Sequence, residues 1–337
     1  METRKVQLSG GTTYTVSLPK SWAEEHGIDA GSTLSLYPNQ DGSLLVDPSV
    51  DRSSTTRSAT LDVSTDSNRA VRQRVEALHA VGFDEGILVD KTGHSTDRRA
   101  HVETTVKDLS GFELLEATET SIRLLNFIDA ENVDVRKSVL RLRLVTLGMH
   151  RDAVDAVVNG DESLAERVIN RDSEADKLFA MITRHFRRAL SDLREVEKLA
   201  YTRDELFEYY YTSRQLERVA DHAEKVARFT LDPGTSIPSS FVDRITTLSY
   251  TSRQVVDNAA DVILEDAGIE GAYSALTKRD ALITDLDDVD RELYDHEDPA
   301  EAYVVGLLLD SIRRTAEYGG NVARIAVQQA TRDCERR

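Results

Sequence analysis

An internal repeat constrains the fold of this chain more than any other feature of its sequence. The segment QLERVADHAEKVARF at 215–229 aligns without gaps on SIRRTAEYGGNVARI at 311–325, a shift of 96 residues. Both segments carry Val-Ala-Arg at the same place, at 226–228 and 322–324. Repeats of this kind indicate a structural unit that occurs twice in the chain. We therefore expect a duplicated helical unit, although two amphipathic helices of similar composition could also resemble each other by chance.

From about residue 134 onward, every long segment has apolar residues at helical spacing. Gly160, the turn Asp232-Pro233-Gly234 and the pair Asp298-Pro299 supply stop and start signals. These signals predict two sets of three helices, at about 134–159, 161–190 and 196–230, and at about 241–266, 270–294 and 298–331. We expect each set to pack as an antiparallel three-helix bundle, with domains at 134–232 and 240–331.

Residues 58–130 alternate between strand-like and helix-like patterns. ATLDVS and GILVD read as strands, each followed by a helical segment, and FELLEAT and SIRLLNFI are two further strand candidates. This alternation predicts a small α/β module. The polar run DPSVDRSSTTRS at 47–58 predicts a linker in front of it.

Residues 1–50 contain short strands separated by turn residues. Apolar residues alternate on both sides of Gly10-Gly11, and Pro19 then begins a short helix that ends at Gly27. A second alternating pair follows, separated by the turn Asn39-Gln40-Asp41-Gly42. Four strands of this length bury too little surface to be stable alone, so we expect this unit to form a homodimer.

The composition is typical of a protein from a reducing and salt-rich compartment. The 337 residues are 40% hydrophobic, and the single cysteine, Cys334, excludes an internal disulfide framework and a cysteine-ligated metal site. The opening residues lack the apolar core of a signal peptide and no stretch reaches the length of a membrane span, so we expect cytoplasmic localisation and no membrane insertion. A net charge of −18, with 33 arginines against nine lysines, indicates a halophilic surface.

The repeated helix resembles a known family. LERVADHAEKVA at 216–227 is closely similar to the signature of the PhoU family of phosphate-uptake regulators, and the residues from Asn159 to Asp172 resemble that family's second helix. The likeness covers about 134–331, with a degraded motif in the second unit. It implies two consecutive three-helix bundles, metal clusters held by acidic pairs at the bundle surface, and restraint of phosphate uptake through transporter or signalling partners.

The N-terminal segment resembles a second family. The run TVSLPKSWAEEHGIDAGSTLSLY at 15–37 has the strand, proline, short helix, Gly-Ile and Gly layout of the AbrB or SpoVT type of swapped-hairpin domain. This resemblance implies a dimer that binds DNA. The two likenesses in this order are similar to the archaeal arrangement in which a PhoU region follows such a domain.

Two acidic pairs are the candidate metal ligands. Glu217 and Asp221 are four residues apart on one predicted helix, and Asp172 and Asp176 repeat that spacing on the preceding helix, so each pair stands on one helix face. Four carboxylates on packed helices repel each other unless protons or a cation are present, and hard divalent or ferric ions (Mg, Zn or Fe) favour such ligands. Pairs at this spacing are common by chance in so acidic a chain, so their place in the PhoU-like signature carries the prediction.

The second unit does not repeat these acids. The positions that match Glu217 and Asp221 are Arg313 and Glu317, so we expect an ion-paired arginine there in place of a metal ligand. The nearby acidic run Asp285, Asp287, Asp288 and Asp290 offers either further ligands or a solvated face.

Two other features of the repeated helices have structural interpretations. Gly319-Gly320 inside a helix costs about 1 kcal/mol per glycine relative to alanine, which favours close helix packing at that point. His222 follows Asp221 but lies about 100° around the helix from it, so we expect an interface residue and not a metal ligand.

The predicted DNA contacts are few, namely Arg4, Lys5 and Lys20. Residues 1–50 hold three bases against six acids, and where DNA-binding members of the family usually carry arginine this chain has Thr15, Ala23 and Glu24. Because phosphate contacts supply most of non-specific affinity, binding would depend on groove shape or base contacts. Dimerisation without DNA binding stays open as the alternative.

Together these features predict a homodimeric, phosphate-responsive regulator of phosphate uptake that binds DNA. One alternative is an adaptor that docks on a phosphate transporter or signalling partner without touching DNA, and another is a metal-binding helical sensor or storage protein. An enzyme is not expected, because the sequence has no Gly-rich phosphate loop and no Gly-x-Ser-x-Gly motif. Its one Glu-x-x-His pair, Glu76 with His79, lies outside the helical region.

Overall fold

The computed structural model describes residues 3–38, 42, 44–48, 56–232, 236–265 and 267–334. The chain divides into two units, Met1–Thr56 and Arg57–Arg337. Most of the predicted linker at 47–58, most of the turn at 39–42 and the turn residues Pro233 and Gly234 lie outside the described residues.

The first unit consists of two separate antiparallel hairpins and a short helix. Strand β1 (Gln7–Ser9) pairs with β2 (Thr13–Thr15), helix α1 (Lys20–Glu25) follows, and β3 (Ser35–Pro38) pairs with β4 (Leu44–Asp47). Gly10 and Gly11 connect β1 to β2 with φ angles of 65° and 81°, a left-handed conformation that glycine adopts at no steric cost. The predicted strands, helix and first turn of this segment are confirmed.

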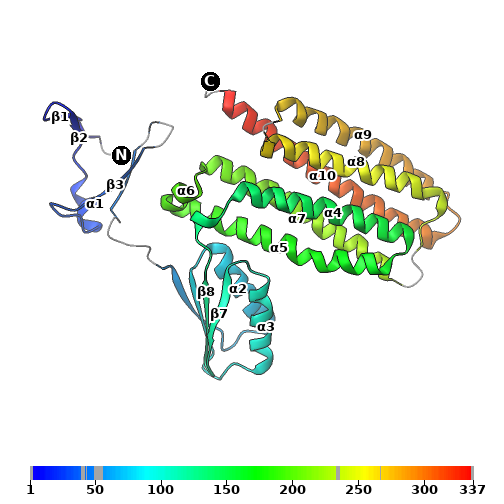
Figure 1. The fold of residues 1–337 in the computed structure, drawn as a ribbon, viewed down its shortest axis with the longest axis horizontal. Coiled ribbons are helices and arrows are strands. Elements are labelled where there is room, and N and C mark those ends of the chain that lie inside the picture. The colour runs from blue at the N-terminus through cyan, green and yellow to red at the C-terminus, as the bar shows by residue number, and fades with distance from the viewer. Residues whose placement is uncertain are drawn as a thin grey trace. The chain divides into compact units, whose positions relative to one another are not determined.

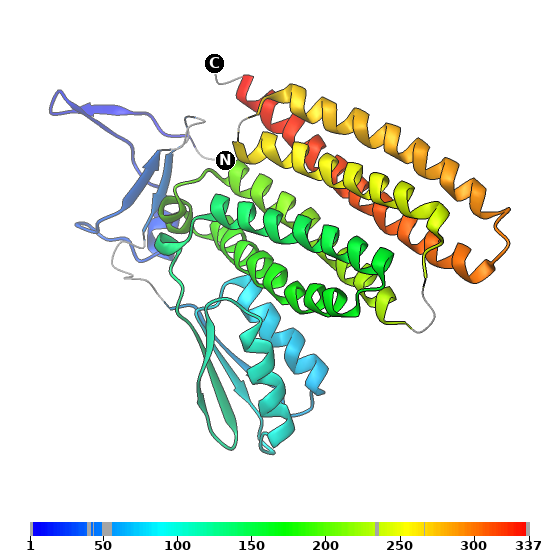
Figure 2. The ribbon, with the colours of Figure 1, turned by 45° about the vertical axis from the view of Figure 1, so that its right-hand side comes forward.

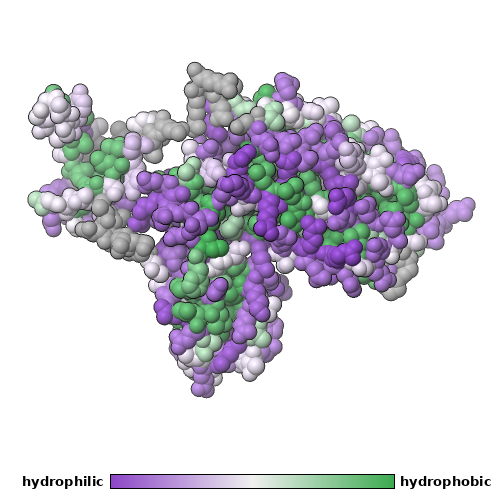
Figure 3. Space-filling view, viewed as in Figure 1, coloured by the Kyte–Doolittle hydropathy of each residue, from purple (hydrophilic) through white to green (hydrophobic). Residues whose placement is uncertain are grey.

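Apolar side chains of this unit stay exposed to solvent. Among its described residues no side chain is buried. Leu8, Tyr14 and Leu36 are 60%, 75% and 58% exposed, and Figure 3 shows apolar surface on this unit. Isolated two-stranded hairpins are marginally stable in water, and contiguous exposed apolar surface marks an interaction site.

The second unit begins with the predicted α/β module. Its strands are β5 (Ser58–Asp62), β6 (Glu85–Val89), β7 (Phe112–Ala117) and β8 (Ser121–Asn126), and its helices are α2 (Asn68–Val81) and α3 (Thr96–Lys107). The sheet order is β5-β6-β8-β7, with β5 parallel to β6 and the other pairs antiparallel. Both helices cover one face of the sheet (Figures 1 and 2), whereas apolar side chains gather on the strands of the other face (Figure 3).

The module is anchored to the helical region by two arginines. Arg184 is 2% exposed and donates to the carbonyls of His79 and Phe83, at 3.1 and 2.8 Å, and to Asp84 Oδ1 at 3.0 Å. Arg188 donates to the carbonyl of Gly82 and pairs with Asp84. The end of α2 and the turn after it are thereby fixed against one helix of the bundle.

The first bundle contains α4 (Val135–Asn159), α5 (Glu162–Ser191) and α7 (Arg203–Leu231), which pack against one another. The third helix was predicted at 196–230, and the predicted start was wrong. A short helix α6 (Leu193–Leu199) ends at Ala200, which has a φ of 57°, and α7 begins anew after Thr202. Thr202 and Glu205 form a capping box that begins the new helix. A 3₁₀ turn, η1 (Ala130–Asn132), precedes α4.

The second bundle contains α8 (Ser239–Glu265), α9 (Ile269–Leu293) and α10 (Pro299–Cys334). It packs on the first bundle through α10 against α7 and through α8 against α4 (Figure 2). The two helix trios expected from the repeat are therefore confirmed. No helix among the described residues has the length and apolar character needed to cross a membrane.

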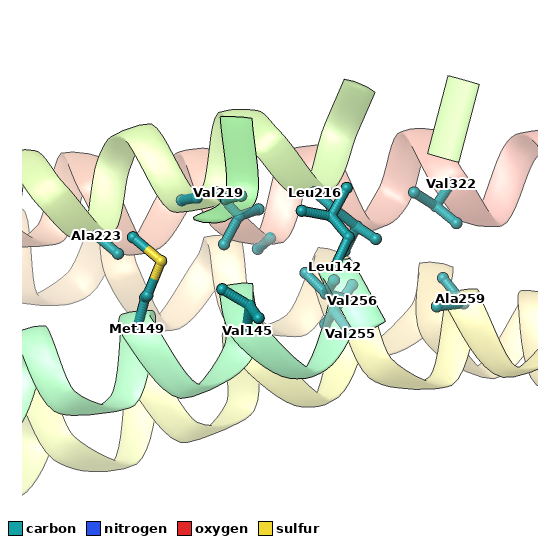
Figure 4. Packing of buried hydrophobic residues seen from close by; sticks show 14 of the residues in the cluster. Leu142, Val145, Met149, Leu216, Val219, Ala223, Val255, Val256, Ala259 and Val322 are labelled. Carbon is teal, nitrogen blue, oxygen red and sulfur yellow. The ribbon is translucent and has the colours of Figure 1, made fainter. Parts of the chain in front are cut away.

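Matching positions of the repeat have the same burial. Leu216 and Ile312 are both buried, as are Ala220 and Ala316. One continuous core joins the two bundles, with Leu142, Val145 and Met149 of α4 near α7 and α8 side chains (Figure 4). A duplicated unit with one apolar stripe per helix explains how both copies contribute to this core.

Gly319 has the close-packing role that its sequence position suggested. A Cβ on this residue would lie 2.8 Å from the backbone nitrogen of Val256 and 2.9 Å from Val255 Cγ1. Only a glycine lets α10 and α8 approach this closely.

Candidate functional site

Three carboxylates from two helices of the first bundle converge at its surface. Asp172 and Asp176 of α5 and Asp221 of α7 each offer an oxygen, and these oxygens all lie within 4.8 Å of one another. The i, i+4 spacing places both α5 acids on one helix face, and the packing of α5 on α7 brings Asp221 to that face. We call these three residues the acidic cluster.

Asp172 is half-buried and Asp176 and Asp221 are exposed, and partial loss of solvent together with mutual repulsion raises the pKa of all three acids. Burial first, and then the charges of Asp176, Glu224 and Asp221, raise the pKa of Asp172 to about 7. Burial and the charges of Asp221, Asp108 and Glu224 raise the pKa of Asp176 to about 6. Burial likewise raises the pKa of Asp221. A bound cation would relieve both the desolvation and the repulsion.

Glu217, the fourth predicted ligand, is directed elsewhere. Its carboxylate accepts two hydrogen bonds from Arg214 Nη1, both of 3.0 Å, and its side chain is 12% exposed. Burial and the charge of Asp221 still raise the pKa of Glu217 to about 7. The structure therefore gathers three of the four predicted acids and places Glu217 beside them, paired with an arginine.

Two charges near the cluster were not anticipated from the sequence. Glu224 lies one turn beyond Asp221 and adds negative charge to the group, although it also pairs with Arg228. Its i+3 spacing from Asp221 was a signal available in the sequence. Asp108 belongs to the α/β module, and no local pattern could have placed it near α5.

The donor set of the acidic cluster fits a metal ion. Asp172 Oδ1 is buried and has no hydrogen-bond partner, which is an unfavourable state for a carboxylate oxygen unless something else satisfies it. At metal–oxygen distances of about 2.0–2.6 Å, opposite ligands of one ion lie about 4–5 Å apart and adjacent ligands about 3–3.7 Å, so a bound ion would draw these three oxygens closer together. An all-carboxylate set suits hard ions such as Mg²⁺ or ferric iron better than Zn²⁺, which prefers nitrogen and sulfur.

The matching place in the second bundle holds an ion-pair network. Arg313 Nη2 lies 2.7 Å from Asp287 Oδ1 and 3.1 Å from Asp290 Oδ2, and Glu317 pairs with Arg314 at 3.0 Å. The expected ion-paired arginine is confirmed, and two acids of the 285–290 run serve it as partners.

The two histidines that the sequence raised are structural. His222 contacts the ring of Tyr318 and lies 3.4 Å from Ser311 Oγ, and burial lowers its pKa. His79 is buried and lies 2.9 Å from the carbonyl oxygen of Ser110, and burial lowers its pKa to about 4. The interface role expected for His222 is confirmed.

The predicted DNA contacts lie in the first unit. Arg4, Lys5 and Lys20 are all exposed. Lys20 of α1 pairs with Glu24, one of the residues that replace arginine, at 3.5 Å. This exposed pair is worth little energetically and leaves the ammonium group able to reach another anion.

The comparisons with known proteins agree with this architecture. Residues 139–230 match the model of the PhoU domain, and residues 7–54 match that of the antidote-toxin recognition protein MazE, a bacterial antitoxin. No curated protein matches the chain.

Two solved structures are similar to the helical region. The crystal structure of PhoU from Pseudomonas aeruginosa has 21% sequence identity and a TM-score of 0.52, and covers 60% of this chain and 98% of that one. The phosphate transport system regulatory protein PhoU from Streptococcus pneumoniae has 18% identity and a TM-score of 0.48, and covers 58% of this chain and 93% of its own. The first of these likenesses shows that the helical region has a PhoU-like fold, within which residues 139–230 match the PhoU domain, and residues 7–54 form a MazE-like and AbrB-like segment that precedes it in the sequence.

Proposed function

We propose that this protein is a cytoplasmic, phosphate-responsive regulator of phosphate uptake that acts as a homodimer on DNA. The observation that carries the proposal is the order of its parts: a MazE-like segment at 7–54 precedes a PhoU domain at 139–230. The first kind of domain is compatible with DNA binding, and the second implies regulation of phosphate uptake.

The exposed apolar side chains of the first unit support dimerisation. Leu8 and Tyr14 on one hairpin and Leu36 and Leu44 on the other are each more than half exposed. A second copy that pairs its hairpins with these would bury them and supply the missing core. The dimer would also double the cations that each copy presents from Arg4, Lys5 and Lys20.

The acidic cluster supports a metal-dependent sensing role. Asp172, Asp176 and Asp221 would hold a hard cation, with Glu217 as a neighbouring acid that can exchange its arginine partner for the ion. The cluster lies near the α/β module, since the charge of Asp108, a residue of that module, helps to raise the pKa of Asp176. A change of charge at the cluster therefore reaches the module directly.

Metal binding is tested by elemental analysis and calorimetry with Mg²⁺, Fe³⁺ and Zn²⁺, each alone. The variant Asp172→Asn/Asp221→Asn loses the stoichiometric ion that the wild type retains. The matched control Asp285→Asn/Asp288→Asn removes the same number of charges from α9 and keeps the ion. Equal metal content in all three proteins would remove both the site and the metal-storage alternative.

DNA binding is tested by pulling the tagged full chain from cells in multimolar KCl and sequencing the associated DNA. The proposal expects enrichment of specific promoters, reduced in Lys5→Gln/Lys20→Gln. Capture of phosphate-transporter subunits without promoter enrichment would instead identify the adaptor that docks on a transporter or signalling partner.

A further inference from the structure

We propose that an open cleft between α7, α9 and α10 is a binding site for a small oligophosphate, an anion with two or more phosphoryl groups. The cleft has a volume of about 780 Å³. Its walls carry four arginines, Arg218 of α7, Arg279 of α9, and Arg314 and Arg324 of α10. This site goes beyond the proposed function, since it uses neither the DNA-binding unit nor the acidic cluster.

The charge of the cleft is opposite to that of the chain. The four arginines face only two carboxylates in the lining, Asp280 and Glu317, whereas the whole chain carries −18. A concave positive region concentrates anions, because low-dielectric walls focus the field. Guanidinium groups are also the side chains best suited to phosphate, since their donors match its oxygens in pairs.

Two of the arginines have no carboxylate partner. Among the described residues neither Arg218 nor Arg324 forms an ion pair, and the charge of Arg218 acts at longer range on Glu217 and Asp221, where it opposes the rise in their pKa. The guanidinium of Arg218 instead lies 5.6 Å from the centre of the Tyr318 ring, and Arg324 donates only to the amide oxygen of Asn321, at 2.8 Å. Both groups keep donors available for an anion.

The side chain of a third arginine lies over a glycine. A Cβ on Gly320 would lie 2.8 Å from Arg279 Cδ and 2.9 Å from its Nη1. Glycine at this position of α10 thus lets the Arg279 side chain, which is 17% exposed, lie across the helix. Gly320 leaves room for this side chain, whereas the glycine itself costs helix stability relative to alanine.

The repeat explains why arginines from both bundles meet here. Arg218 and Arg314 occupy the same place in the two copies, 96 residues apart. They line one cleft from α7 and α10. Equivalent cations on two different helices suit a ligand with more than one anionic group, which a chain of phosphoryl groups provides and a single orthophosphate does not.

The expected affinity is modest. Arg279 pairs with the exposed Asp280, with its Nε 2.9 Å from Oδ1, and Arg314 pairs with Glu317. An anion has to share these two arginines, and concentrated salt screens its charge. We expect dissociation constants of about 10 μM to 1 mM, which calorimetry can measure.

The test titrates tripolyphosphate, pyrophosphate, orthophosphate and sulfate into the full chain after EDTA treatment and dialysis. Tripolyphosphate binds most tightly and orthophosphate most weakly. Arg218→Gln/Arg324→Gln weakens tripolyphosphate binding by about tenfold or more. Arg324→Gln alone weakens it too, and leaves the fold intact because Arg324 is exposed and hydrogen-bonds to Asn321, a residue one turn away on the same helix.

The control variant is Arg244→Gln/Arg291→Gln, which removes two exposed arginines that pair with Glu292 and Asp288. It changes the net charge equally and leaves the affinity within about twofold. Three results would overturn the site: equal weakening in both double variants, no saturable binding by the wild type, or tighter binding of orthophosphate than of tripolyphosphate. None of these bears on the metal or DNA experiments, so the two proposals fail separately.

Discussion

His222 of α7 and Tyr318 of α10 pack their rings together across the boundary between the two bundles, with centroids 5.7 Å apart. These residues are counterparts in the repeat, separated by 96 positions. The duplicated helices therefore meet at equivalent points, as in a dimer whose two copies have been joined in one chain. His222, which follows Asp221 of the acidic cluster, therefore packs in the interface between the two copies.

A double-mutant cycle on His222→Ala and Tyr318→Ala measures this contact. Ring pairs couple by about 0.5–1.5 kcal/mol, so the double variant is more stable than the sum of the two single effects predicts. Urea unfolding gives the free energies. As a control, Tyr303 is an exposed tyrosine of α10, the helix that carries Tyr318. A cycle of His222→Ala with Tyr303→Ala shows no coupling. Equal coupling in both cycles would refute a direct contact.

Gly319→Ala destabilises the protein by about 1–3 kcal/mol, because the new methyl group overlaps the backbone of α8. The matched change Gly306→Ala lies on the same helix, where a Cβ meets only Leu293 Cδ1 at an ordinary 3.8 Å. It stabilises the helix by about 0.5–1 kcal/mol. Thermal midpoints of the two variants should therefore move in opposite directions, and movement in the same direction contradicts the packing described.

Arg184→Ala loosens the α/β module from the bundle. It removes three hydrogen bonds to the 79–84 segment and takes a charged donor from the part-buried Phe83 carbonyl, at a cost of about 2–4 kcal/mol. Arg187→Ala, at an exposed position of the same helix, costs less than about 0.5 kcal/mol. Hydrogen exchange of α2 amides reports the loosening, and unchanged protection in the Arg184 variant would show that the arginine does not hold the module.

Asp172→Asn stabilises the metal-free protein in a pH-dependent way. The folded pKa of Asp172 is about 7, above its ordinary value of 3.8, so the folded state binds the proton more tightly than the unfolded state. Stability from this group is present at low pH and is lost as pH rises from about 4 to 7. Asparagine carries no charge and avoids this loss of stability. Above pH 7 the free energy of unfolding of the variant therefore exceeds that of the wild type by about 1–2 kcal/mol, after allowing for solvent screening.

Unfolding of the two proteins in EDTA at pH 5 and pH 8 checks this sign. The difference at pH 5 is about two fifths of that at pH 8, and Asp285→Asn, on an exposed face of α9, shows no such pattern. Added metal ion reverses the order, because only the wild type binds it. A variant that is less stable than wild type in EDTA at pH 8 would mean that ionised Asp172 does not destabilise the folded protein.

Periodic features of the sequence predicted most of the fold. The alternation in 58–126 and the helical spacing after residue 134 correspond to strands and helices of the structure, because each element has its own apolar face. The break between α6 and α7 was not predicted, because apolar residues keep their helical spacing across it. The left-handed residue at the break is an alanine, which gives no sequence signal for a helix end. The capping box at Thr202 and Glu205 was the local signal that could have placed it.

The candidate site was predictable in part. Spacing alone paired the acids on each helix, but the pairing of Glu217 with Arg214 depends on side-chain rotamers that no periodicity encodes. Asp108 and Arg184 act between segments that are distant in sequence, so only the packed structure brings them to the cluster and the module. The arginine cleft likewise combines residues from three helices that the sequence gives no reason to group.

Promoter occupancy of the full chain, measured across the genome in phosphate-rich and phosphate-limited cells, decides whether this protein regulates phosphate uptake at DNA. We expect enrichment at promoters of phosphate-uptake genes, with an occupancy that changes between the two conditions and falls in Lys5→Gln/Lys20→Gln. Occupancy of no promoter in either condition, in cells where the protein is abundant and dimeric, would contradict it.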